Sequence, residues 1–110
     1  MPIIVKNEDR KVKQQADGWE EILLADAETI GSPALTARHW SFQPNVTGPQ
    51  IEHGDYDEML YVISGNGYAW VGDQRFSLTP ESLLWLEPGD SYRLEAGPQG
   101  MEVLQGIAPG

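Results

Sequence analysis

Short runs of apolar or alternating residues, separated by closely spaced turn residues, are the feature that most limits how this chain can fold. Gly, Pro, Asn and Asp separate these runs at fairly even intervals, which is typical of an all-β sandwich or barrel. One stretch with helical character, residues 25–30, is too short to pack alone. The candidate strands are residues 19–26, 35–42, 50–53, 59–64, 68–71, 74–78, 83–86, 91–95 and 101–107.

The chain length and the polarity of its first residues predict one domain with an arm. A chain of 110 residues has room for one compact domain. Lys6 to Gln15 are nearly all charged or amide residues, and Val12 is the apolar exception. We therefore predict a polar N-terminal arm over residues 1–16, either mobile or added as an edge strand to a partner, and a barrel over residues 17–110.

The charge and the residue types that are missing exclude several classes of function. Seven Lys and Arg against seventeen Asp and Glu leave a formal charge of −10, which repels nucleic acid and anionic membrane surfaces. The absence of cysteine removes disulfides, thiolate metal sites and thiol nucleophiles. No apolar run approaches the roughly 20 residues of a spanning helix, and no signal-peptide pattern opens the chain. We expect a cytoplasmic protein without nucleic-acid or membrane partners.

The segment around His53 carries the most chemical information. Residues two apart in a strand share a face, so the side chains of His53 and Asp55 would point the same way. Glu58 opens the next strand, whose two faces are both apolar: Leu60 and Val62 lie on the face of Glu58, and Met59, Tyr61 and Ile63 lie on the other. Such a strand is central, or its outer face is covered by another sheet or by a second subunit. A homodimer would provide that cover.

This segment resembles the first motif of the cupin superfamily, Gly-x5-His-x-His-x3-4-Glu-x6-Gly. His53 stands at the first His, Asp55 at the second, Glu58 at the Glu, and Gly65 follows. In the stretch that is similar to the second motif, Gly89 fits and Tyr92 replaces the third His. The resemblance covers roughly residues 17–107 and implies a cupin jelly-roll β-barrel, also called a double-stranded β-helix.

The same resemblance implies a metal site that is kept only in part. Cupins typically hold a metal with three imidazoles and a carboxylate, whereas a site of His53, Asp55 and Glu58 would be rich in oxygen and would suit Mn or Fe better than Cu or Zn. Tyr92 could join such a site only as a phenolate. A second imidazole, from His39, becomes available if its face of the 35–42 strand is the inner one; strand parity alone leaves that open.

Tyr56-Asp57-Glu58 is also similar to the cupin encoded with ethanolamine-utilisation genes, which likewise lacks the His triad.

Each residue singled out above also has a structural alternative. The acidic group can be a solvated loop, His53 an ordinary buried histidine, and Tyr92 a residue of the barrel mouth. Trp85 can be a core or subunit-contact residue, or a flat wall for a ligand.

Three functions follow from this interpretation. The first is the binding of a small polar metabolite, with acid–base isomerisation, dehydration or elimination by Glu58, His53 and Tyr92, and with Asp55 and Trp85 as ligand-binding residues. The second is a metal-dependent oxygenase or lyase with a degenerate site. The third is a non-catalytic ligand-binding or assembly module.

Overall fold

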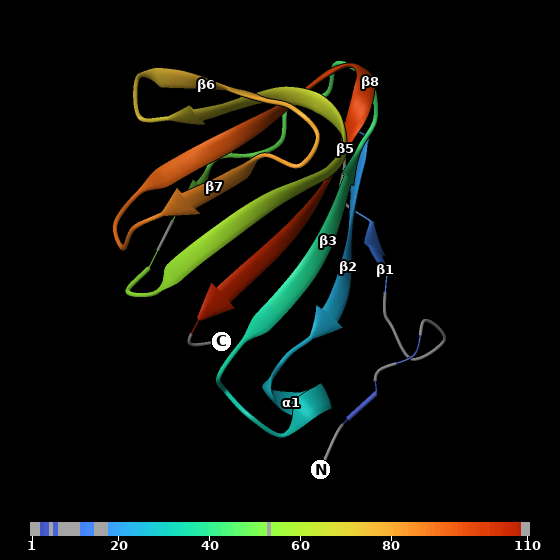
Figure 1. The fold of residues 1–110 in the computed structure, drawn as a ribbon, viewed down its shortest axis with the longest axis vertical. Helices are drawn as coiled ribbons and strands as arrows, with labels where there is room; N and C mark the ends of the chain where they lie inside the picture. Colours follow the sequence, from blue (N-terminus) through green and yellow to red (C-terminus); the bar gives the residue numbers. More distant parts are fainter. Residues whose placement is uncertain (1–2, 5, 7–11, 15–17, 53, 109–110) are drawn as a thin grey trace.

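The computed structural model describes residues 3–4, 6, 12–14, 18–52 and 54–108 (Figure 1). Antiparallel strands dominate this part of the chain, with one short helix. The elements are β1 (Val12–Gln14), β2 (Trp19–Ala25), α1 (Ala27–Ile30), β3 (Thr36–Phe42), β4 (Ile51–Glu52), β5 (Asp57–Val71), β6 (Gln74–Leu78), β7 (Leu83–Leu86) and β8 (Ser91–Ala108). The predicted all-β class is confirmed.

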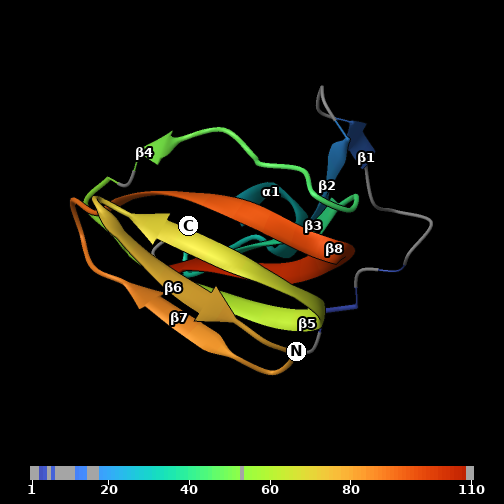
Figure 2. The same ribbon diagram turned by 90° about the horizontal axis from the view of Figure 1, so that it is seen from above.

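The strands form one curved sheet in the order β1-β2-β3-β8-β5-β6, with β4 paired to β8 and β7 paired to β5. Figure 2 shows β5, β6, β7 and β8 curving around a common interior. Within the predicted arm, β1 pairs with β2 of the same chain. The described residues contain no helix that is long and apolar enough to cross a membrane.

Two long strands replace four of the predicted short ones. Residues 59–64 and 68–71 both belong to β5, and residues 91–95 and 101–107 both belong to β8. Gly65-Asn66-Gly67, which separates the predicted strands 59–64 and 68–71, forms an irregularity in the register between β5 and β8. Gly65 has a φ of 76°, and a Cβ there would collide with the carbonyl group of Gly100. A glycine therefore lets the ladder bend sharply without breaking.

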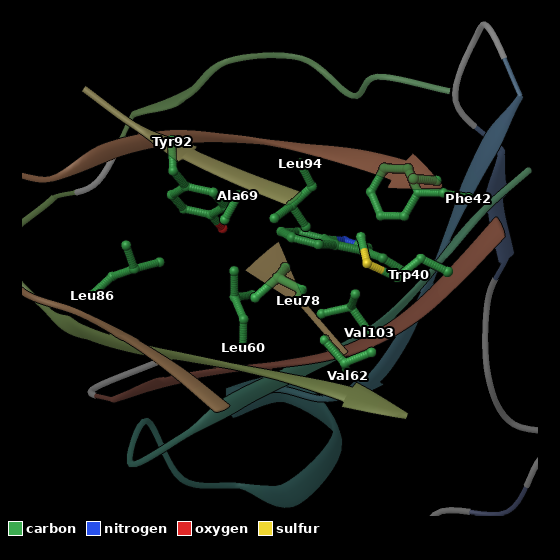
Figure 3. Close-up of a cluster of buried hydrophobic side chains, with 12 residues drawn as sticks. Trp40, Phe42, Leu60, Val62, Ala69, Leu78, Leu86, Tyr92, Leu94 and Val103 are labelled. Carbon is green, nitrogen blue, oxygen red and sulfur yellow. The ribbon is translucent and has the colours of Figure 1, made fainter. Parts of the chain in front are cut away.

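The inward rows of the strands build the core (Figure 3). Leu60 and Val62 of β5 are buried together with Glu58, whereas Ile63 is exposed, which confirms the predicted face of this strand. At one end Trp19 stacks on Phe42, with ring centroids 5.5 Å apart and planes 9° apart. The other labelled core residues are Trp40, Ala69, Leu78, Leu86, Tyr92, Leu94 and Val103.

Candidate functional site

A buried carboxylate with two donors on one oxygen is the chemical centre of the barrel. Glu58 is 1% exposed, and Tyr92 and Gln105 are also buried. The Tyr92 hydroxyl donates to Oε2 of Glu58, and Nε2 of Gln105 donates to the same oxygen at 2.6 Å. In Figure 3 the Tyr92 side chain projects into the barrel interior. A buried carboxylate is costly unless it is hydrogen-bonded, and these two donors offset that cost.

The Tyr92 hydroxyl acts as a donor in this arrangement. Burial raises the pKa of Tyr92 far above its ordinary value of 10.0, and the negative charge of Glu58 and the hydrogen bond to it raise it further. Ionisation would place a second negative charge beside a carboxylate in a poorly solvated interior. The phenol therefore keeps its proton in this arrangement and serves as a hydrogen-bond donor.

The contacts continue from Gln105 along the barrel wall. Nη1 of Arg38 donates to Oε1 of Gln105 at 3.1 Å, and Nε of Arg38 lies 3.8 Å from Oε1 of Glu21. Nε1 of Trp40 donates to the same Glu21 oxygen at 2.8 Å. The amide of Gln105 is thus oriented by a guanidinium on one side and a carboxylate on the other. We call this series, Tyr92–Glu58–Gln105–Arg38–Glu21–Trp40, the polar wall.

A cavity of about 360 Å³ opens beside the polar wall. Glu21, Arg38, Glu58 and Gln105 contribute its polar lining. Its apolar lining comes mainly from Trp19, Trp40, Ile51, Tyr56 and Ile107. Few polar groups among apolar and aromatic walls are the usual makeup of a small-molecule site.

Among the predicted site residues, Glu58 and Tyr92 are brought into direct contact, whereas His53 lies outside the described residues. Asp55 is exposed in a bend before β5. Trp85 was predicted to bind ligand, but its side chain is 57% exposed and is not in the cavity lining. Alternation explains this, because Leu86 of β7 is buried and its neighbour must face the other way.

The alternative that placed His39 inside the barrel is wrong. Trp40 and Phe42 occupy the inner face of β3, so His39 faces outward, where its Nε2 lies 3.5 Å from Oε1 of Glu102. Over the described ranges, no three His, Asp or Glu side chains are grouped so that they could hold a metal ion. Asp55 is exposed and His53 lies outside the described residues, so the metal site of His53, Asp55 and Glu58 stays a prediction.

Sequence reasoning missed Gln105, Arg38 and Glu21. Arg38 alternates with Trp40 and Phe42, so a charged group shares a face with large aromatic residues. Gln105 interrupts the inward apolar row of Met101, Val103 and Ile107. A polar residue in an otherwise buried row is the signal that could have identified both. No comparable signal marks Glu21.

A curved antiparallel jelly roll with inward polar side chains facing a cavity places this chain in the cupin, or RmlC-like, superfamily. Within that class the chain belongs to the AraC-like ligand binding domain family, whose sequence profile matches residues 32–105. No curated protein matches the sequence.

Solved structures share this fold at low sequence identity. KdgF from Halomonas sp. has a TM-score of 0.81 at 16% identity, over 99% of this chain and 95% of that one. An RmlC-like cupin from Shewanella frigidimarina also has a TM-score of 0.81 at 16% identity, over 100% and 93%. A predicted oxalate decarboxylase from Thermotoga maritima reaches 0.84 at 16% identity, over 98% and 100%.

Proposed function

We propose that this chain binds a small polar metabolite in the cavity beside the polar wall. The observation that carries the proposal is the buried Glu58 carboxylate, held by Tyr92 and Gln105 and lining that cavity. The volume of about 360 Å³ lies at the small end of the range for ligand pockets, roughly 300–1,000 Å³. Membership of a ligand-binding family supports the same function.

The four tryptophans provide a test that locates the ligand. Trp19 and Trp40 line the cavity, whereas Trp85 is on the outer surface. Trp70 is not in the cavity lining, and its Nε1 donates to Oε1 of Glu95 at 3.0 Å. In ¹⁵N NMR spectra of the full chain, a library of polar metabolites should contain one that shifts the indole signals of Trp19 and Trp40. The signals of Trp70 and Trp85 are internal controls and should stay in place. A library that moves only the control signals, or none, would overturn the proposal.

Acid–base catalysis is a second candidate, favoured by the contact between Tyr92 and Glu58 at the cavity. Glu58 would accept a proton from the substrate, and the protonated Tyr92 would hold the carboxylate in place or donate to a substrate oxygen. Isomerisation, dehydration or elimination suits such a pair. One structural neighbour is named as a predicted oxalate decarboxylase and another as a polyketide cyclase. These names support catalysis as a function for a barrel of this fold.

Turnover assays with Glu58→Gln and Tyr92→Phe test this second candidate. Both variants should lose most activity and alter the pH–rate profile, whereas the matched Glu102→Gln, on the outer face, should not. Unchanged turnover in both variants would end the catalytic hypothesis. A role for His53 and the likeness to the ethanolamine-utilisation cupin stay predictions.

We also propose that the chain forms a homodimer through an outer apolar face made by Met59, Tyr61, Ile63, Leu83 and Trp85. Met59 lies opposite Trp85, and Tyr61 opposite Leu83, so β5 and β7 present these side chains together. Ile63, Leu83 and Trp85 are 45%, 56% and 57% exposed. This face carries no charge on a chain with a net charge of −10, so a second copy can approach it with the least repulsion.

Light scattering at micromolar concentration tests the dimer. The unmodified chain should have the mass of two copies, and Leu83→Lys should have the mass of one. Phe76→Lys is the matched control, because Phe76 is also exposed but lies on β6, outside this face. A monomeric unmodified chain would disprove the proposal.

A further inference from the structure

Four side chains on the outer surface of the barrel form a series of stacked cations and aromatic rings. Tyr68 and Trp70 occupy the outward row of β5, because Ala69 between them is fully buried. Arg75 of β6 and Arg93 of β8 lie opposite Trp70 on its two sides, and both are exposed. We call Arg93, Trp70, Arg75 and Tyr68 the cationic ladder.

Contacts within the cationic ladder hold both guanidinium groups over aromatic rings. Cζ of Arg75 lies 4.3 Å from the ring centroid of Tyr68 and 5.7 Å from that of Trp70. Cζ of Arg93 lies 5.1 Å from the ring centroid of Trp70. A guanidinium that stacks on a ring keeps its N–H donors available in its own plane, where a carboxylate can accept two of them. The ladder therefore presents two oriented sites for carboxylates.

These two cations have no acidic partner in the part of the chain that the structure describes. Neither Arg75 nor Arg93 is a member of an ion pair there. The carboxylate of Glu95, two residues from Arg93 in the same outward row of β8, accepts from Nε1 of Trp70 at 3.0 Å. Two guanidinium groups beside one carboxylate leave this face positive.

The cationic ladder also concentrates the positive charge of the barrel in one place. Residues 17–110 contain three basic residues against fifteen Asp and Glu, and the third basic residue, Arg38, belongs to the polar wall. A chain with a net charge of −10 repels acidic partners over most of its surface. The outer face of β5, β6 and β8 is therefore the part of the barrel that an acidic partner can approach.

A small pocket continues the cationic ladder beyond Tyr68. Its volume is about 120 Å³, and its lining includes Tyr68 and Ser77, which lie opposite each other across β5 and β6. Asn66 and Thr79 add polar groups to the lining, and Pro98 adds an apolar one. Sites for small molecules are larger, roughly 300 Å³ or more, so this pocket suits one side chain of a bound peptide. A row of cations that continues into such a pocket fits an extended segment better than a compact anion.

We propose that the cationic ladder docks an extended acidic segment of a partner protein. Because β6 and β8 flank β5, Arg75 and Arg93 leave the sheet about 10 Å apart. Acidic residues two or three positions apart in an extended segment are separated by about 7–10 Å, so each of two carboxylates can meet one guanidinium. A neighbouring side chain of the segment would enter the pocket beyond Tyr68.

A capped peptide in which Glu alternates with Ser is the probe, because alternate residues of an extended chain share a face. The same peptide with Gln in place of Glu, and inorganic phosphate, are the control ligands. In ¹⁵N NMR titrations of the full chain, the Glu peptide should shift the indole signal of Trp70 to saturation and leave those of Trp19, Trp40 and Trp85 in place. The Gln peptide should bind at least about tenfold more weakly. An unmoved Trp70 signal, or a Gln peptide or phosphate that binds as tightly as the Glu peptide, would overturn the inference.

Matched variants separate the charge of the cationic ladder from the charge of the whole chain. Arg75→Gln and Arg93→Gln should each weaken binding of the Glu peptide about threefold, and the double variant about tenfold. Both positions are exposed, so these variants should keep the fold. Lys13→Gln removes the same charge on β1, at the other end of the strand order, and should leave the affinity unchanged. Equal weakening by Lys13→Gln would overturn the inference.

Light scattering distinguishes a partner protein from a second copy of this chain. The double variant of Arg75 and Arg93 should have the same mass as the unmodified chain. A lower mass would identify a second copy as the occupant and would overturn the inference. The outcome is separate from that of the ligand-binding function, because Trp19 and Trp40 report on the cavity and Trp70 reports on the cationic ladder.

Discussion

The interior of the barrel contains two regions that come from the same strands and differ in chemistry. One is an aliphatic core, represented by Leu60, Val62, Leu94 and Val103, and the other is the polar wall. In β8, Val103 and Gln105 are successive inward residues, so the change occurs within a single row. Burial stabilises the core directly, whereas each buried polar group must find a partner. The core therefore provides the stability of the barrel, whereas the polar wall carries the proposed ligand binding.

The largest expected effect is in the aliphatic core. Leu60→Ala should lower the free energy of unfolding by about 2–5 kcal/mol, because the substitution leaves a cavity in a close-packed interior. Denaturant unfolding measures this loss. Ile4→Ala, at a position that is 80% exposed and outside the proposed dimer face, should cost less than about 0.5 kcal/mol. A Leu60→Ala loss as small as that of the control would contradict the assignment of stability to the core.

A smaller effect is expected in the polar wall. Tyr92→Phe removes the hydroxyl that donates to Glu58 and should lower the free energy of unfolding by about 1–3 kcal/mol. The control is Tyr68→Phe. Cζ of Arg75 lies over the ring of Tyr68, 4.3 Å from its centroid, and this contact does not need the hydroxyl. Equal effects in the two variants would show that the Tyr92 hydrogen bond adds nothing to stability.

The free energy of unfolding at alkaline pH should report the same Tyr92 contact in the unmodified chain. The pKa of Tyr92 is higher in the folded state than the ordinary 10.0, so its contribution is complete below about pH 10 and is lost as the unfolded chain ionises above it. The free energy of unfolding should then fall by up to about 1.4 kcal/mol per pH unit from this group alone. Tyr92→Phe should fall less steeply than the unmodified chain, and identical slopes would contradict the assignment.

The smallest expected effect lies outside both regions. His39 and Glu102 form a partly exposed pair on the outer face, with Nε2 of His39 3.5 Å from Oε1 of Glu102. Such pairs contribute about 0–1 kcal/mol at most. His39→Gln should therefore change the thermal midpoint very little. A large drop would show that this outer pair contributes as much to stability as the hydrogen bonds of the polar wall.

Most of the fold and part of the site were predictable from local patterns. Alternation correctly grouped Glu58 with Leu60 and Val62, because a strand has only two faces. The cupin motif singled out Glu58 and Tyr92, which the structure brings into contact. Gln105, Arg38 and Glu21 were missed because their meeting depends on which strands pair. Arg38 lies opposite Gln105 across β3 and β8, and Glu21 lies opposite Trp40 across β2 and β3.

The sequence by itself determined the antiparallel β class and the division of each strand into two rows, since both follow from local spacing. Only the tertiary structure decided which row of β3 faces inward, excluding His39 and burying Trp40. It also joined Glu58 to Gln105 across 47 positions of the chain. The reason is physical: strand alternation is a property of neighbouring residues, whereas the choice of inner face and of cross-strand partner is made by the packing of the whole barrel.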